Sequence, residues 1–198
     1  MRIASLVLAA GRSSRMGLRN KLLEPVGGES MIRRVAAIAI AGGAQPVIVV
    51  TGYEAASVGA ALHGLGVTVI LNLEYADGLS TSLRAGVSAL PADIDGALIL
   101  LGDMPEVEAS VLSLLMASFT GMSAICVPVR HGRRGNPVLW GSRYFPEMME
   151  LTGDFGAKPL MARHEAHLIE VEVATDSIFY DVDAPEDLAR LKPPGETG

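Results

Sequence analysis

Residues 3–23 read IASLVLAAGRSSRMGLRNKLL, an apolar run that stops abruptly at a small-residue, basic loop. Apart from Ser5, the run over residues 3–9 is apolar and does not alternate with polar residues. Such strands belong to parallel sheets that are covered by helices on both faces. The stretch therefore predicts a buried parallel strand that opens directly into a loop.

This loop is suited to binding anions. Gly11 and Gly17 permit backbone angles that other residues resist. Four cations fall within ten residues that contain no carboxylate: Arg12, Arg15, Arg19 and Lys21. A loop of this kind can present backbone N–H groups and cations to a polyphosphate. The alternative is an ordinary turn that carries a solvated basic patch.

The chain alternates strand and helix patterns up to about residue 129. Strands are predicted at 3–9, 46–51, 67–71, 97–101 and 124–129, and helices at 31–41, 55–62, 80–90 and 107–119. Ser30 is placed to cap the first helix, and Gly42 with Gly43 to end it. The order predicts an α/β fold with a doubly wound, mostly parallel sheet, whose ligands bind outside the carboxyl ends of the strands.

The alternation breaks after residue 129. Residues from about 130 to 165 are interpreted as a small insertion that shapes a partner site, with helices at 145–151 and 157–163. An edge strand at 168–173, a last strand at 178–182 and a closing helix at 185–191 follow. The length suits one domain, expected to span 1–192, with 193–198 as a flexible tail.

Composition narrows the class of protein. Hydrophobic residues make up 49% and charged residues 19%, and the formal net charge is −6. General nucleic-acid binders are usually basic, so no nucleic-acid partner is expected. No apolar run approaches the roughly 18 residues of a membrane span, so we expect no membrane partner and a cytoplasmic location. Cys126 is the single cysteine, and its apolar surroundings favour a small buried residue.

The basic loop does not have the spacing of two common phosphate-binding loops. Leu18 stands where a P-loop needs lysine, and Arg12-Ser13 interrupt a Gly-x-Gly-x-x-Gly pattern. The loop resembles instead the signature of the MobA-like nucleoside-triphosphate transferases, Leu-x-(Ala/Gly)-Gly-x-x-x-Arg-Met-Gly followed by Lys-x-Leu. Here it occupies Leu8 to Gly17, with Lys21 and Leu23. The resemblance implies a nucleotidyltransferase.

The resemblance also implies roles for the loop. The nucleotide would be bound by Leu8, Ala9, Ala10, Gly11, Arg12, Ser13, Ser14 and Lys21. Lys21 would reach the α- and β-phosphates, and Arg15 would bind the leaving pyrophosphate. Together with Asp103 these two cations form the expected catalytic set. The nucleophile is an already ionised phosphate, so positioning and charge neutralisation can supply the rate without a general base.

Two aspartates are candidate metal ligands. Asp103 follows the most apolar strand, within Gly-Asp-Met-Pro, where a carboxylate can hold Mg²⁺. That motif resembles the metal-binding motif of the family; a turn or helix cap is the alternative. Asp183 begins an Asp-x-Pro-Glu-Asp-Leu segment that resembles the family's second metal-binding segment, and it can also cap the closing helix. The implied cofactor is Mg²⁺, with Mn²⁺ as a possible substitute.

The segment Gly78-Leu79-Ser80-Thr81-Ser82 places three hydroxyls where a loop meets a helix. Ordinary helix capping is one interpretation. The other is base selection, in which Gly78, Leu79, Ser80 and Ser82 read the edge of a pyrimidine. With Leu-Ala-Ala-Gly in the first loop, this segment resembles the branch of the family that transfers cytidylyl groups to the molybdenum cofactor. The guanylyltransferase branch usually shows Leu-Ala-Gly-Gly and Pro-Leu-Ala-Gly instead.

Two later segments, 135–139 and 153–158, also resemble the cytidylyltransferase branch, although Asn136 and Lys158 stand where many members have His and Arg. The implied substrates are CTP and the phosphorylated pterin molybdopterin, and the implied protein partner is an acceptor molybdoenzyme or its chaperone. Alternatives are GTP as the donor, a sugar or polyol phosphate as the acceptor, or a nucleotide-binding regulator without turnover. Arg133, Arg134 and Lys158 would receive the pterin phosphate, unless they form a solvated basic loop. Trp140 is expected in the core.

Overall fold

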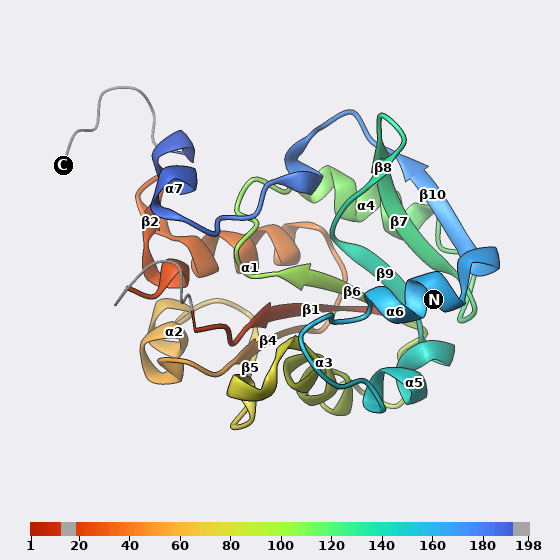
Figure 1. Cartoon of the computed structure of the whole chain (residues 1–198), viewed down its shortest axis with the longest axis horizontal. Helices are drawn as coiled ribbons and strands as arrows, with labels where there is room; N and C mark the ends of the chain where they lie inside the picture. Colours follow the sequence, from red (N-terminus) through yellow and green to blue (C-terminus); the bar gives the residue numbers. More distant parts are fainter. Residues whose placement is uncertain (13–18, 192–198) are drawn as a thin grey trace.

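The computed structural model describes residues 1–12 and 19–191. Within them an eight-stranded mixed sheet has the order β10-β7-β9-β6-β1-β4-β5, with β8 beside β7 (Figure 1). Its strands are β1 (Ile3–Ala9), β4 (Val47–Thr51), β5 (Thr68–Leu71), β6 (Gly96–Leu101), β7 (Ile125–Arg130), β8 (Arg133–Arg134), β9 (Val138–Gly141) and β10 (Leu168–Glu172). The predicted α/β class with a mostly parallel sheet is confirmed.

Strand β1 lies inside the sheet and pairs in parallel with both β4 and β6. Strand β5 extends the parallel half beyond β4. On the other side β9 is antiparallel to both β6 and β7, and β10 is parallel to β7 at the far edge. Part of the segment at 130–165 is therefore built into the sheet as β9, and the edge strand expected at 168–173 is confirmed as β10.

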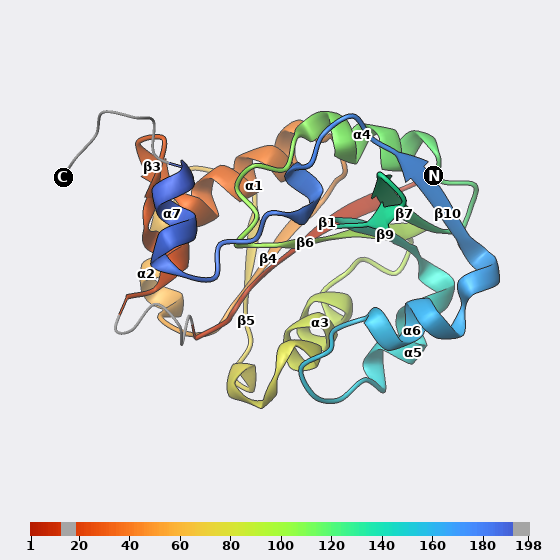
Figure 2. The same ribbon diagram turned by 45° about the horizontal axis from the view of Figure 1, so that its top comes forward.

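Helices cover both faces of the sheet. Helices α1 (Met31–Ala41), α2 (Ala55–Ala61) and α4 (Ala109–Ala117) share one core cluster, and α3 (Leu79–Ser88), α5 (Phe145–Met149) and α6 (Lys158–Arg163) share the other. Figure 2 shows α1 and α4 above the sheet, with α3, α5 and α6 below it. The remaining helix, α7 (Pro185–Leu191), packs near a hairpin of β2 (Pro25–Val26) and β3 (Glu29–Ser30).

The side chains of β1 explain its sequence. Val7 and Ala9 belong to the core on the α1 side, and Leu6 and Leu8 to the core on the α3 side. Both faces of the strand are thus buried, so an alternating polar pattern would place polar groups in a core. Cys126 and Trp140 are buried as expected.

Two local predictions need correction. The strand at 178–182 is wrong: the structure has a 3-10 turn at Ser177–Phe179 and no regular element at 180–183. The apolar Ile178 side chain is buried in the core, as a strand residue would be. Its carbonyl, however, accepts a hydrogen bond from Asn136 N at 3.0 Å and does not pair in a strand. Ser30 occupies the N-cap position of α1, but its side chain makes no capping hydrogen bond.

Other local predictions hold. Gly42 ends α1, and α7 spans the predicted closing helix. Across residues 1–12 and 19–191, none of the helices combines the length and the apolar character that crossing a bilayer requires.

Candidate active site

The basic loop and Asp103 leave the sheet at the same edge. Strands β1 and β6 are parallel neighbours, so their carboxyl ends lie side by side. Strand β1 continues into Gly11 and Arg12, and β6 into Gly102 and Asp103. The N–H of Gly102 donates to the Leu8 carbonyl at 2.9 Å, which extends the pairing by one step and fixes where the Asp103 loop departs.

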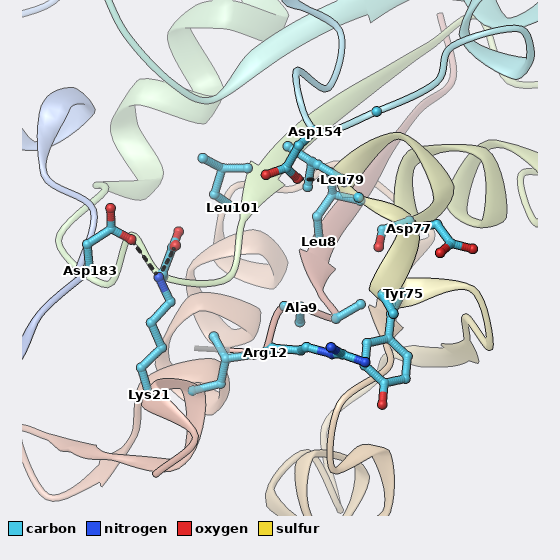
Figure 3. Close-up of a pocket in the computed structure, with 18 residues that line it drawn as sticks. Leu8, Ala9, Arg12, Lys21, Tyr75, Asp77, Leu79, Leu101, Asp154 and Asp183 are labelled. Carbon is cyan, nitrogen blue, oxygen red and sulfur yellow. Dashed lines mark hydrogen bonds and ion pairs between the residues drawn. The ribbon is translucent and has the colours of Figure 1, made fainter. Parts of the chain in front are cut away.

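Lys21 is delivered to this edge by a short 3-10 turn at Lys21–Leu23. Asn20 caps the turn, because its side-chain oxygen accepts a hydrogen bond from Leu22 N at 3.1 Å, and Leu22 is buried beneath it. The Lys21 ammonium then donates to Asp103 Oδ2 at 2.7 Å and to Asp183 Oδ1 at 3.0 Å (Figure 3). One cation and two carboxylates from three distant segments therefore meet.

The two aspartates are held together by their backbones. Val182 N donates to the carbonyl oxygen of Asp103 at 2.9 Å. The start of α7 is fixed by Asp187, whose carboxylate accepts from Asp183 N at 3.0 Å and from Ala184 N at 2.9 Å. The hydrogen bonds from Ala184 and Asp183 lower the pKa of Asp187. Asp187 thus holds the two residues that precede α7, and the Asp183 carboxylate accepts the hydrogen bond from Lys21.

The electrostatics of the cluster depend on burial. Burial raises the pKa of Asp103, and the nearby Lys21 opposes that effect. Burial also works against the charge of Lys21, but the carboxylates of Asp103 and Asp183 outweigh it and raise the Lys21 pKa above 10.5. Lys21 therefore stays protonated at neutral pH.

The cluster meets the chemical requirement of a divalent cation site. The second carboxylate oxygen of Asp103, Oδ1, is buried and finds no hydrogen-bond partner among the described residues. Asp183 keeps 40% of its side chain exposed beside it. Mg²⁺ typically binds one or two carboxylates and completes its shell with water and phosphate oxygens. Two carboxylates at the end of a cavity fit that pattern. A bound cation would also give the buried Asp103 Oδ1 the partner that it lacks among the described residues.

The cluster forms one end of a cavity of about 700 Å³. In Figure 3, Lys21 and Asp183 lie at one end, and Tyr75, Asp77 and Leu79 at the other. The residues predicted for the site that line this cavity are Leu8, Ala9, Ala10, Gly11, Arg12, Lys21, Gly78, Leu79, Ser82, Asp103 and Asp183. Ser80 does not line it. Ser13, Ser14 and Arg15 lie outside the described residues.

Two of the three hydroxyls after Gly78, those of Thr81 and Ser82, belong to a small polar network. Asn72 Nδ2 donates to Thr81 Oγ1 at 2.8 Å and to Ser82 Oγ at 3.1 Å, and Thr81 Oγ1 lies 2.9 Å from the carbonyl oxygens of Glu74 and Gly78. Ser80 Oγ is buried and unpaired within the described part of the chain. The Thr81 and Ser82 hydroxyls thus stabilise the loop that bounds the cavity, and Ser82 also lines the cavity itself.

Tyr75 and Asp154 line the cavity, and the sequence analysis did not predict either of them for the site. The Arg12 guanidinium lies over the Tyr75 ring, 5.6 Å from its centroid. Asp154 comes from a loop 75 residues beyond Leu79, and its Oδ1 accepts a hydrogen bond from Leu79 N at 2.9 Å. A signal for Asp154 was present in the segment 153–158, which carries a family resemblance but gives no hint of its partner.

A second cavity of about 380 Å³ adjoins the first and shares Leu8, Leu79, Leu101 and Asp154 with it. Arg133, Arg134 and Lys158, the candidates for a partner's phosphate, all line this cavity. Arg133 lies over the Phe179 ring at 4.5 Å. Arg134 is held by Glu165 at 2.6 Å and by Glu170 at 2.8 Å, so its charge is already neutralised.

Comparison with known proteins places this geometry in a family. The model of the MobA-like NTP transferase domain matches residues 5–168. The chain is 32% identical to the purine catabolism protein PucB of Bacillus subtilis (strain 168), over 93% of each protein. It is 27% identical to the molybdenum cofactor cytidylyltransferase of Escherichia coli (strain K12), over 96% of this chain and 95% of the relative. It is 26% identical to nicotine blue oxidoreductase of Paenarthrobacter nicotinovorans, over 96% of each.

Solved structures agree. A nucleotidyl transferase from Methanothermobacter, Mth528, superposes with a TM-score of 0.84 at 29% identity, covering 96% of this chain and 95% of that one. Rv0371c of Mycobacterium tuberculosis H37Rv, in complex with manganese, gives a TM-score of 0.81 at 26% identity over 96% and 98%. The chain therefore belongs to the MobA-like NTP transferase family.

Proposed function

We propose that this nucleotidyltransferase moves CMP from CTP to the terminal phosphate of the pterin molybdopterin and releases pyrophosphate. The observation that carries the proposal is the meeting of Lys21, Asp103 and Asp183 at one end of a cavity whose other end is the Gly78 loop. A cation and a pair of carboxylates suit a metal-bound triphosphate, and the opposite end is left for the base.

In the proposed reaction, an oxygen of the acceptor phosphate attacks the α-phosphorus of CTP. The bond from that phosphorus to the bridging oxygen breaks, and the electron pair leaves with pyrophosphate. Lys21 offsets the negative charge that develops on the phosphates, and Arg15 is proposed to bind the pyrophosphate. The acceptor phosphate is already ionised, so the protein need only position the two substrates and neutralise the charge that develops on the phosphates.

Asp103 and Asp183 are proposed to hold Mg²⁺, for which Mn²⁺ would substitute. Bound there, the ion would neutralise phosphate charge and orient the triphosphate. A manganese complex of the 26% identical Rv0371c supports a divalent cation in this family. Lys21 then has a second role, because it keeps the two carboxylates at a fixed separation before the ion arrives.

The second cavity is the proposed acceptor site. It touches the nucleotide cavity along Leu8, Leu79, Leu101 and Asp154, so an acceptor bound there lies next to the triphosphate. Arg133 and Lys158 are its proposed phosphate-binding cations. The exposed ring of Phe155 at its rim offers an apolar surface to a planar pterin.

The choice of CTP is supported by the Gly-Leu-Ser-Thr-Ser-Leu segment and by the 27% identical cytidylyltransferase of E. coli. The test is an incubation of the protein with Mg²⁺, each of the four ribonucleoside triphosphates and one acceptor at a time: molybdopterin, a polyol phosphate or a sugar 1-phosphate. Pyrophosphate release and mass spectrometry report the product. The proposal expects a pterin cytosine dinucleotide from CTP and molybdopterin. A dinucleotide formed only from GTP, or a product formed only on a sugar or polyol phosphate, would contradict it.

A further inference from the structure

The wall between the two cavities contains a segment at 151–156, called here the 151–156 strap. Asp154 lines both cavities, Gly153 lines the nucleotide cavity, and Phe155 lines the acceptor cavity. The strap connects α5 to α6, which lie on the same face of the sheet as α3 (Figure 2). A change in the position of the strap therefore alters the wall of the nucleotide cavity.

The strap is hydrogen-bonded to α3 at three points. Arg84 Nη1 donates to the Leu151 carbonyl at 2.8 Å. Ser80 N donates to the Gly153 carbonyl at 3.2 Å, and Leu79 N donates to Asp154 Oδ1 at 2.9 Å. In Figure 3 the Asp154 carboxylate points at Leu79, beside the end of the cavity that holds Asp77 and Tyr75. Two of the three bonds thus end on the first residues of α3.

These bonds meet a need of the helix itself. The first N–H groups of an α-helix have no partner within the helix. The N-cap residue of α3 is Gly78, which has no side chain to supply one. The Asp154 carboxylate and the Gly153 carbonyl replace the missing cap, and a negative group at this end also suits the helix dipole.

The fit between strap and loop is tight. Gly78 has φ +108°, and a Cβ placed on it would lie 2.5 Å from the Gly153 carbonyl oxygen. The backbone at Gly78 and Leu79, which bounds the end of the cavity opposite Lys21, therefore takes its position from the strap. The Asp154 carboxylate is the acceptor for the Leu79 N–H, so removing it takes away one of the bonds that hold this end of the cavity to the strap.

We propose that Asp154 is a positioning residue for the nucleotide, which sets the base end of the cavity by holding Leu79 N. The proposal rests on the proposed function insofar as the Gly78 end receives the base and the Lys21 end the phosphates. Asp154 acts through Leu79, on the ground state and the transition state alike. Its loss therefore raises KM for the nucleotide and leaves kcat nearly unchanged.

The test uses the full chain with Asp154→Ala, Asp154→Asn and, as a matched control in the same strap, the exposed Thr152→Ala. Binding of Mg·CTP and of Mg with inorganic triphosphate is measured by calorimetry. Inorganic triphosphate probes the Lys21 end alone. We expect D154A to weaken CTP binding about tenfold and inorganic triphosphate by less than about twofold. D154N should stay within about threefold of the wild type for CTP, because its amide oxygen accepts the same N–H bond. T152A should match the wild type.

A second variant keeps the test decisive if D154A folds poorly. Arg84→Met loosens the strap at Leu151 and should weaken CTP in the same selective way. Equal loss of both probes in these variants, unchanged CTP binding in D154A, or D154N as weak as D154A would each overturn the proposal. If the wild type prefers another triphosphate, the proposed function fails on that result alone. The comparison with inorganic triphosphate, repeated with the preferred nucleotide, still decides the role of Asp154.

Discussion

Lys21 Nζ and Asp103 Oδ2 lie 2.7 Å apart, although 82 residues separate them in the chain. The sheet brings them together, because β1 and β6 are parallel neighbours that end at the same edge. Only 12% of the Lys21 side chain and 20% of the Asp103 side chain are exposed. A charge pair this sheltered contributes to the stability of the fold, in addition to the catalytic role proposed for it.

Lys21→Met should therefore destabilise the protein by roughly 2 to 3 kcal/mol, because Asp103 is left buried with its cation removed. The double variant Lys21→Met/Asp103→Asn should recover most of that loss, since the buried charge is gone. Urea unfolding at pH 7 measures both. If the double variant is as unstable as the sum of the two single variants, the pair is not coupled in the folded state.

Gly78→Ala should destabilise the protein by about 2 to 3 kcal/mol, through strained backbone and a collision with Gly153. Gly64→Ala is the matched control, because Gly64 has φ +82° but nothing within 4 Å of a new Cβ. It should lose only about 1 kcal/mol, from the backbone alone. Thermal or urea unfolding compares them, and equal losses would show that the strap yields at Gly78.

Glu147 gives a pH dependence. A hydrogen bond with His164 at 2.8 Å, and one from Arg163 at 2.9 Å, lower the pKa of Glu147 below its ordinary 4.5. A carboxylate with a lowered pKa stabilises the fold above its unfolded pKa, and this contribution fades as the pH falls through the folded value. Glu147→Gln should cost about 0.5 kcal/mol at pH 6, and the difference should shrink below pH 4.5. A difference that grows on acidification would reverse the sign and refute the interpretation.

Cys126 should be inert in the native protein. It is fully buried in β7, and burial raises the pKa of its thiol to about 11. Iodoacetamide at pH 8 should leave it unmodified for hours and label it fully in denaturant, because the thiolate is the reactive form. Intact-mass spectrometry reads both states. Rapid labelling without denaturant would mean that β7 opens easily.

The sequence predicts the half of the fold where local pattern and topology coincide. Strand β1 is apolar because both of its faces are buried, and regular alternation of strand and helix implies parallel neighbours. The carboxyl ends of parallel strands lie at one edge of a sheet, so a basic loop after one such strand and Asp103 after another fall at the same edge. These features can be predicted because each depends on the residue pattern of one short stretch of the chain.

What the sequence does not predict depends on distant partners. Strand β9 has four residues, and nothing in Val138–Gly141 shows that it lies antiparallel between β6 and β7. Ile178 is apolar like a strand residue but is buried in a 3-10 turn. Asp154 falls in a segment that resembles the family, but nothing in the sequence shows that it accepts a hydrogen bond from Leu79, 75 residues away. Contacts of this kind leave no periodic signal in the chain.

The central claim is that Asp103 is part of a metal site. The most direct test measures the binding of Mn²⁺ in the presence of CTP by electron paramagnetic resonance, in the wild type, Asp103→Asn and Glu106→Gln. Asn keeps the shape of Asp103 without its charge, and Glu106 is an exposed carboxylate three residues away. The account predicts that the wild type and E106Q bind Mn²⁺ and CTP together, and that D103N loses at least about 100-fold in affinity for the ion. Undiminished Mn²⁺ binding by D103N would contradict the account, because the carboxylate that Lys21 holds would then have no part in the metal site.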